Sequence, residues 1–503
     1  MILIYPPSAK LSEPPPGIAR LCGAFRYHGL FVRGIDMNRE GFDFLYSKEV
    51  LPRDRWGSRA LHKKDMNLGL VCGNKGYESL DRYKNAVRDI TKILSLASEN
   101  TGSLVSLANF KHDYLSPVKT KDLATAAEHP QDNIYFAYFE RRFKALAKES
   151  PGIDTVGFSL NFLNQALTTF AMIGHLRAMY PSTRIIVGGG LVTSWMRQPG
   201  WKNPFPSHVD LMVQGEGEGT LLGLYGIDRP EKHYMPDYSD FTGFSYLSPG
   251  FVLPYSASSG CYWRKCTFCP EMAEKNPYGP VPVSKVMTHL RQLSETLNPV
   301  MIHLVDNAVS PSMLKALASD YFSTPWYAFA RITPHLADPD FCKALKASGC
   351  AMLQLGLESG DPHVLACMNK GIDLTLVSRS LLSLHDAGIK TYVYLLFGTP
   401  AENEIAAGKT MDFVVAHSPM ISFLNIALFN LPYFSDNSAN LETHLFYDGD
   451  LSLYREFKHP LGWDRSGIRQ FLSKEFKKHP KIADIVKHDP PVFGSNHAPF
   501  FSD

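Results

Sequence analysis

The stretch FVLPYSASSGCYWRKCTFCPE, residues 251–271, joins an apolar run to three closely spaced cysteines. Residues 251–255 predict a strand, and Cys261, Cys266 and Cys269 follow it in one loop. Three thiolates presented from one loop suit a [4Fe-4S] cluster, in which one iron stays open to a small molecule with amine and carboxylate groups. Two alternatives stay open. A structural zinc site would want four tetrahedral ligands, and the thiols could also be unligated.

The same apolar run begins a regular alternation of strand-like and helical segments. The expected strands are 251–255, 301–305, 326–330, 352–357, 391–397 and 421–429. Helical periodicity appears between them, for example at 283–297, 339–347, 374–387 and 405–416. Six such repeats predict a partial (β/α)6 barrel over residues 251–431, with its active site on the loops after the strands.

The N-terminal half shows a second alternation, interrupted by an insertion. Strand-like runs at 2–5, 31–36, 155–160, 184–187 and 211–213 predict a doubly wound, Rossmann-like parallel sheet over residues 1–226. Residues from about 42 to 130 lack clear strands and are interpreted as a mostly helical insertion. Ligands bind at the carboxyl ends of strands in such sheets. The candidate residues there are Pro7, Ser8, Ser159, Gly188, Gly189, Gly190, Gly215 and Glu216.

The remaining segments and the composition complete the predicted organisation of an α/β protein. A linker rich in Pro, Asp, Tyr and Ser is expected at 227–250, and a C-terminal extension at 432–503. The net charge of +2 indicates neither a nucleic acid nor an anionic membrane as partner. Neither a signal peptide nor an apolar run long enough to span a bilayer is apparent. The five other cysteines are interpreted as buried thiols, which fits a reducing cytoplasm.

The cysteine loop resembles that of the radical S-adenosylmethionine superfamily, as do the segments LQLGLESGDPHVLACMNKG (353–371) and YVYLLFGTPAENE (392–404). The resemblance implies that the open iron binds S-adenosylmethionine, and that one electron from the cluster cleaves it to a 5'-deoxyadenosyl radical. It also implies the residues that contact the cosubstrate. These are Phe268, Asp306, Arg331, Glu358, Ser359, Gly398 and Pro400.

Three of these residues have structural alternatives. Glu358 and Arg331 could form an ion pair at the end of the barrel, and Asp306 could cap a helix. The chain also departs from the superfamily pattern, because four residues, 262–265, separate the first two cysteines where three are usual. A bulge could absorb the extra residue, with a possible change in the geometry or stability of the cluster.

The N-terminal half is similar to the cobalamin-binding domain fused to many radical S-adenosylmethionine enzymes. The resembling segments are IYPPSAKLSEPPPGIARLCGAFRYHG, VGFSLNF, IIVGGGLVTS and DLMVQGEGEGTL. The Asp-x-His-x-x-Gly loop that supplies a cobalt ligand in classical cobalamin domains is absent from the sequence. The resemblance therefore implies cobalamin without assigning a cobalt ligand.

These resemblances imply a cobalamin-dependent methyltransferase acting on an unactivated carbon of a small molecule or peptide. Alternatives are a radical rearrangement, cyclisation or oxidation without methyl transfer, and a non-catalytic iron-sulfur binding protein. A low-potential electron donor such as flavodoxin or ferredoxin is the expected protein partner.

Overall fold

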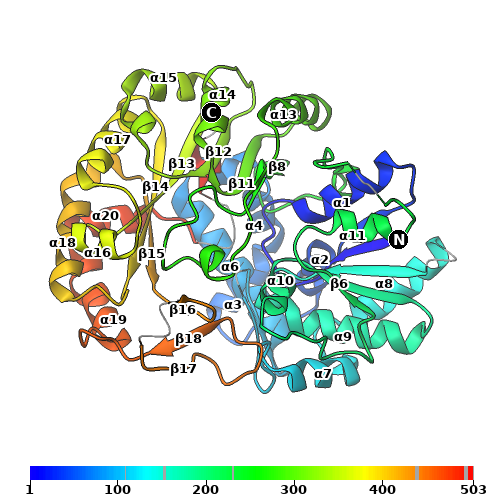
Figure 1. Ribbon diagram of the computed structural model, residues 1–503. Helices are drawn as coiled ribbons and strands as arrows, with labels where there is room; N and C mark the ends of the chain where they lie inside the picture. The colour runs from blue at the N-terminus through cyan, green and yellow to red at the C-terminus, as the bar shows by residue number, and fades with distance from the viewer. Residues whose placement is uncertain (108, 151–153, 229–230, 437–440, 492–496, 502–503) are drawn as a thin grey trace. The chain divides into compact units, whose positions relative to one another are not determined.

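The computed structural model describes residues 1–503 except 108, 151–153, 229–230, 437–440, 492–496 and 502–503. The chain divides into two compact units (Figure 1). Unit 1 contains Met1–Phe251 and, among short returns of the chain, Tyr447–Leu453. Unit 2 begins at Val252 and contains most of the rest.

Unit 1 is built on a five-stranded parallel sheet in the order β2-β1-β5-β6-β7. The order in which successive strands are added reverses between β1 and β5, which is the switch point typical of doubly wound folds. The predicted fold class is therefore confirmed. The strands are β1 (Ile2–Tyr5), β2 (Arg33–Asp36), β5 (Thr155–Ser159), β6 (Arg184–Gly188) and β7 (Leu211–Met212). The helices that alternate with them include α1 (Pro16–Tyr27), α9 (Leu163–Met179), α10 (Gly190–Met196) and α11 (Glu218–Gly223).

The insertion between β2 and β5 is mostly helical and also holds a hairpin that the sequence analysis missed. Strands β3 (Ser103–Val105) and β4 (Phe110–His112) pair antiparallel. Strands of three residues are too short to show a period of two, so the sequence carried no readable signal for them. The helices are α2 (Met37–Ser47), α3 (Arg55–His62), α4 (Lys64–Val71), α5 (Asn74–Tyr77), α6 (Leu80–Ser98), α7 (Thr120–Glu128) and α8 (Phe136–Glu149).

The segment 227–250, expected to be a linker, contributes to the packing of unit 1. The carboxylate of Asp240 accepts a hydrogen bond from the backbone N–H of Gly34 at 2.8 Å. The hydroxyl of Tyr246 donates to Asp36 at 3.0 Å, and both side chains are buried. Aromatic and carboxylate side chains in a Pro-rich segment thus hold it against the sheet.

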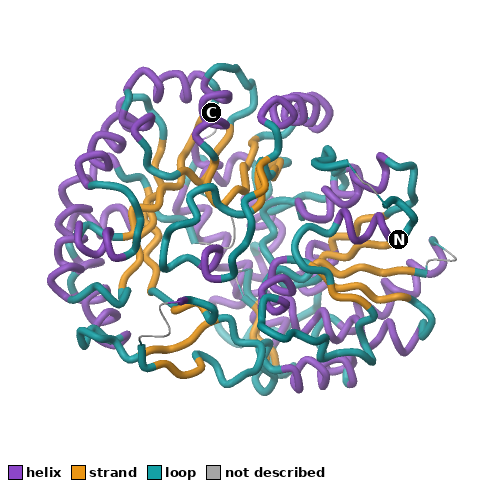
Figure 2. Tube along the Cα trace, in the orientation of Figure 1, coloured by secondary structure: helices purple, strands orange, loops and turns teal. Residues whose placement is uncertain are grey.

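Unit 2 is built on a six-stranded parallel sheet in the order β15-β14-β13-β12-β11-β8, which confirms the predicted partial barrel. The strands are β8 (Val252–Tyr255), β11 (Met301–Val309), β12 (Trp326–Ala330), β13 (Cys350–Glu358), β14 (Lys390–Phe397) and β15 (Phe423–Leu428). Helices α13 (Val283–Leu297), α14 (Pro311–Ala318), α15 (Pro339–Ala347), α17 (Leu374–Asp386) and α18 (Glu404–His417) connect them. Figure 2 shows these helices on the outer side of the strands. Because all six strands are parallel, their carboxyl ends lie at the same edge of the sheet.

A hydrophobic cluster fills the barrel at the amino ends of its strands. It includes Val252, Met352, Tyr392 and Phe423 from four strands, and Ala498 from the C-terminal tail. The tail before it forms a small antiparallel sheet and two helices. These elements are β16 (Leu431–Pro432), β17 (Thr443–Leu445), β18 (Tyr454–Phe457), α19 (Arg465–Lys474) and α20 (Pro480–His488).

Two further findings bear on the predicted environment. In the part of the chain that the structure describes, every helix is too short or too polar to cross a bilayer. All eight cysteines are free thiols. Cys22, Cys342 and Cys350 are buried as expected, but Cys72 is half-buried and Cys367, at the end of helix α16 (Pro362–Cys367), is exposed.

Candidate active site

The three clustered cysteines lie in a loop at the carboxyl edge of the barrel. A short antiparallel ribbon, β9 (Ser258–Ser259) with β10 (Gly279–Pro280), closes the base of this loop. Cys261, Cys266 and Cys269 are all half-buried, and the backbone N–H of Cys269 donates to the carbonyl of Cys266 at 3.2 Å. The fold thus presents three thiols from one loop, as predicted.

The buried carboxylate of Asp306, within β11, holds the chain just before this loop. Its side chain accepts hydrogen bonds from the N–H of Ala257 at 2.9 Å and from the hydroxyl of Ser258 at 2.5 Å. The residue is 2% exposed, and burial raises the pKa of its carboxyl group. Asp306 therefore anchors the base of the cysteine loop. Helix α14 is capped by Ser310, so Asp306 does not cap it.

The cysteine loop docks on the segment that follows helix α16. The N–H of Thr267 donates to the carbonyl of Met368 at 3.0 Å, and its hydroxyl donates to the carbonyl of Cys367 at 3.2 Å. The indole N–H of Trp263 donates to the carbonyl of Asn369 at 3.3 Å. The cysteine loop and the segment 353–371, which were identified separately in the sequence, are thus in direct contact. Their separation in the sequence does not predict that contact.

Two cations lie beside the thiols. Arg331, just after β12, places Nη1 3.8 Å from Sγ of Cys266. Lys370 places Nζ 2.8 Å from Oε1 of Glu358, and their side chains are 7% and 12% exposed. Glu358 therefore pairs with Lys370, a residue the sequence analysis did not consider, and the suggested pair with Arg331 is wrong.

The backbone around Glu358 is shaped to accommodate this pair. The pairing of β13 with β14 shifts register between Gly356 and Glu358, and Glu358 has a φ of +70°. A Cβ atom on Gly356 would lie 2.5 Å from Oε1 of Glu358 and 2.7 Å from Nζ of Lys370. A side chain at position 356 would therefore force the pair to shift, and glycine leaves room for it.

Two of the thiols, Cys266 and Cys269, have a raised pKa in the metal-free chain and so hold their protons more tightly than an ordinary cysteine. Burial raises the pKa of Cys266, while Lys370 and Arg331 act in the opposite direction. Burial raises the pKa of Cys269 to about 11, opposed by the backbone amides of Glu271 and Met272. Binding a metal group would therefore release protons.

The other predicted cosubstrate residues lie on the same edge in different environments. Ser359 is fully buried, and its hydroxyl hydrogen-bonds with Thr410 at 3.2 Å. Phe268 packs beside Val364 and Met368. Gly398 has a φ of +84°, and Pro400 is half-buried.

The inner face of the barrel is accessible in its carboxyl half. Alternate residues of a strand point to the same face, so Gln354 and Glu358 share the face of Met352. The hydroxyl of Tyr394 donates to Gln354 at 3.1 Å, and the ring of Phe329 lies 5.0 Å from that of Tyr394. Tyr394 and Phe329 are half-buried, in contrast to the packed amino end. The sequence analysis did not identify Gln354, Tyr394 and Phe329 as residues of the inner face. The alternation with a period of two along 352–358 could have indicated Gln354.

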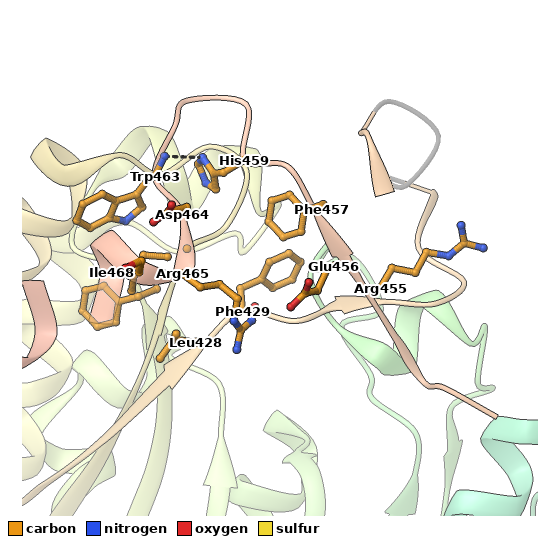
Figure 3. A pocket seen from close by; sticks show the side chains of 13 residues that line it. Leu428, Phe429, Arg455, Glu456, Phe457, His459, Trp463, Asp464, Arg465 and Ile468 are labelled. Carbon is orange, nitrogen blue, oxygen red and sulfur yellow. Dashed lines mark hydrogen bonds between the residues drawn. The ribbon is translucent and has the colours of Figure 1, made fainter. Parts of the chain in front are cut away.

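A cavity of about 270 Å³ lies elsewhere in unit 2, at the carboxyl ends of β14 and β15 (Figure 3). Tail residues close it, and the rings of Phe429 and Phe457 meet there with centroids 5.8 Å apart. Gly398 is the one predicted site residue in its lining. The carboxylate of Glu402 accepts a hydrogen bond from the indole N–H of Trp463, a lining residue of the cavity, at 3.2 Å. Burial raises the pKa of Glu402 to about 7.

In unit 1, the sheet order brings the predicted crevice residues to one edge. Pro7 and Ser8 are buried, and the hydroxyl of Ser8 hydrogen-bonds with Tyr135 at 2.9 Å. Ser159, Gly188 and Gly189 are half-buried, whereas Gly190, Gly215 and Glu216 are exposed.

Two contacts shape this edge. Gly189 has a φ of +109°, and a Cβ atom there would lie 2.5 Å from the carbonyl oxygen of Leu160. Glu216 lies 3.4 Å from Arg20, which also pairs with Glu218 at 2.8 Å. Glycine therefore lets the chain turn tightly at this edge, and the Glu216 carboxylate is held by a cation.

Comparison with known proteins agrees with this geometry. Residues 255–414 match the family described as the Radical SAM superfamily. The bacteriochlorophyllide d C-12(1)-methyltransferase of Chlorobaculum tepidum is 26% identical over 199 residues. That match covers 37% of this chain and 42% of the relative, so the chain spans less than half the length of that protein.

Two solved structures of the radical S-adenosylmethionine methyltransferase TsrM from Kitasatospora setae share the fold. One, with tryptophan substrate and a cosubstrate analogue bound, has a TM-score of 0.57 at 14% identity and covers 97% of this chain and 89% of that chain. The other, with cobalamin and a [4Fe-4S] cluster bound, has a TM-score of 0.53 at 14% identity and covers 89% and 77%. The six-stranded parallel sheet, the cysteine loop at its carboxyl edge and the family match together show that residues 255–414 form a domain of the Radical SAM superfamily.

Proposed function

We propose that this protein is a radical S-adenosylmethionine enzyme that transfers a methyl group to an unactivated carbon with the help of cobalamin. One observation carries the proposal. The loop with Cys261, Cys266 and Cys269 lies at the carboxyl edge of the barrel, with the cation of Arg331 3.8 Å from the sulfur of Cys266. That is the edge at which parallel barrels hold their active sites.

The residues present fit an iron-sulfur cluster in their donor chemistry. Thiolate is the ligand that such clusters prefer, and nearby cations offset its negative charge. The described residues hold no set of three or more His, Cys, Asp or Glu side chains arranged around a single metal ion. A cluster differs from a single ion because its three thiolates would bind three separate irons. When bound, the cluster would supply the electron that cleaves S-adenosylmethionine.

The cosubstrate residues have two kinds of role in this proposal. Phe268, Glu358, Gly398 and Pro400 would contact S-adenosylmethionine. Asp306 and Ser359 would act indirectly, through the backbone that their buried hydrogen bonds hold, and Arg331 through the sulfur of Cys266 that it faces.

Cobalamin binding by unit 1 is supported by the shape of the sheet edge and by the fold likeness to TsrM. The edge is open at Gly190 and Gly215, where small residues let a large flat ligand approach the backbone. When bound, cobalamin would carry the methyl group, and no residue is assigned as its cobalt ligand.

Methyl transfer is supported by the likeness to two methyltransferases, the Chlorobaculum tepidum relative and TsrM. We further propose a small-molecule or peptide substrate, and flavodoxin or ferredoxin as the low-potential donor. Free thiols at all eight cysteines support a reducing compartment such as the cytoplasm.

The test uses anaerobically reconstituted full-length protein with dithionite as reductant. We expect 5'-deoxyadenosine by mass spectrometry, lost in Cys266→Ala and retained in Cys72→Ala, a control at another half-buried thiol. Protein that holds a cluster and yet forms no 5'-deoxyadenosine would favour the non-catalytic binding protein.

Two further measurements separate the remaining readings. Hydroxocobalamin should co-elute with the protein in gel filtration and change its absorbance spectrum. With substrate, methyl transfer also yields S-adenosylhomocysteine, whereas rearrangement, cyclisation or oxidation yields none. Free elution of the corrinoid would refute the cobalamin part of the proposal and leave the radical chemistry standing.

A further inference from the structure

The extra residue in the cysteine loop belongs to a segment that carries a tightly held aromatic ring. Trp263 lies between the first two cysteines, and its ring centroid is 4.0 Å from Cζ of Arg331. A Cβ atom on Gly371, whose φ is +68°, would lie 2.2 Å from the ring. With the indole hydrogen bond to Asn369, these contacts fix the ring against the barrel edge.

Arg331 is held on three sides. Trp263 covers one face of its guanidinium group. Nη2 donates to the carbonyl of Lys370, and Nη1 points to Sγ of Cys266 at 3.8 Å. The residue is 7% exposed, so water has little access to its charge. A planar fork with one stacked face and two engaged edges keeps its orientation, which a lysine ammonium would not do.

Hydrogen bonds to cluster sulfurs are among the factors that set the reduction potential of an iron-sulfur cluster. Reduction adds one negative charge to the cluster, so a cationic donor at a ligating sulfur stabilises the reduced form more than the oxidised form. Arg331 stands where such a donor would act.

We propose that Arg331 donates a hydrogen bond to the thiolate of Cys266 in the cluster-loaded protein and raises the reduction potential of the cluster. Trp263, one of the four residues between the first two cysteines, is the residue that positions Arg331. The absence of a side chain at Gly371 leaves space for the Trp263 ring. The step affected is uptake of one electron from the external reductant, and Arg331 neither gains nor loses a proton. This inference rests on the proposed cluster.

The test is an EPR-monitored redox titration of reconstituted full-length protein. Because one charge-assisted hydrogen bond changes an equilibrium about tenfold, the ratio of reduced to oxidised cluster at a fixed potential should fall about tenfold in Arg331→Met. For one electron this is a shift of about 59 mV to lower potential. Lys265→Met is the matched control, since it removes an exposed cation 4.8 Å from the same ring centroid.

Further variants test the positioning. Trp263→Leu should shift the potential in the same direction by less, with the iron content of the wild type. Arg331→Lys keeps the charge and should also lower the potential, which keeps the test decisive if Arg331→Met assembles no cluster.

Three outcomes would overturn the inference. Arg331 variants could hold a full cluster at the wild-type potential, or Lys265→Met could shift it equally, which would indicate a general charge effect. Wild-type protein without iron or an EPR signal would overturn the proposed function as well, so the two failures are distinguishable.

Discussion

The ion pair between Lys370 and Glu358 allows a sharp test of the site's architecture. Replacing Lys370 with Met removes one partner of a pair whose side chains are 7% and 12% exposed. Glu358 then stays buried without its cation. Breaking a buried pair in this way costs about 3–5 kcal/mol of unfolding free energy.

The matched control is Lys409→Met in the same unit. Lys409 pairs with Asp361 at 2.7 Å, and although the Asp361 side chain is 5% exposed, that of Lys409 is 56% exposed, so water screens the pair. A pair of that kind contributes about 0–1 kcal/mol, so the two variants should differ by about 3 kcal/mol.

The assay is urea unfolding of metal-free protein under anaerobic conditions. With a slope of about 3 kcal/mol per M, Lys370→Met should unfold at a urea concentration about 1 M lower than Lys409→Met. Adding Glu358→Met should recover most of the loss, because apolar residues often replace a buried pair at little cost. Equal midpoints for the two single variants would refute the reasoning.

Three further predictions concern neighbouring groups. Asp306→Asn should lower the iron content after reconstitution, because one of its two accepted hydrogen bonds is lost at the base of the cysteine loop; wild-type iron content would contradict the anchoring role. Gly356→Ala should lower the unfolding free energy by about 1–3 kcal/mol in urea, because its Cβ would overlap the ion pair; an unchanged midpoint would show that the pair can move. The pKa of Glu402, raised by burial from 4.5 to about 7, means that the folded state binds the proton more tightly than the unfolded state. Stability should therefore fall between about pH 4.5 and 7 by at most about 3 kcal/mol, and Glu402→Gln should abolish this fall in melting curves recorded across that range.

Much of the fold was predictable because both main sheets are parallel and their strands are mostly buried, with long strands in unit 2. Runs such as 352–357 and 391–397 are apolar over most of their length, and helical periodicity separates them. The hairpin at 103–112 and the packing of 227–250 escaped prediction. Their short strands and isolated polar contacts leave no periodic pattern.

In the candidate site, too, local features were predictable from the sequence and contacts between distant residues were not. The sequence places the three thiols in one loop after a strand, because ligand spacing is a local property. The partner of Glu358 could not be inferred, since several cations follow that strand and only the turn after helix α16 brings Lys370 to it. Asp306 was expected just after a strand but lies within β11, which runs to Val309, and its contacts depend on residues that follow the neighbouring strand β8.

By itself, the sequence determined the order of the strands along the chain, the cysteine loop and the open carboxyl edge, because each follows from residues near one another in the chain. Only the tertiary structure decided that Arg331 faces the sulfur of Cys266 and that Trp263 covers the guanidinium group. These contacts join residues 65 or more positions apart. Sheet order and register, which arise from packing of the whole unit, set which distant side chains meet.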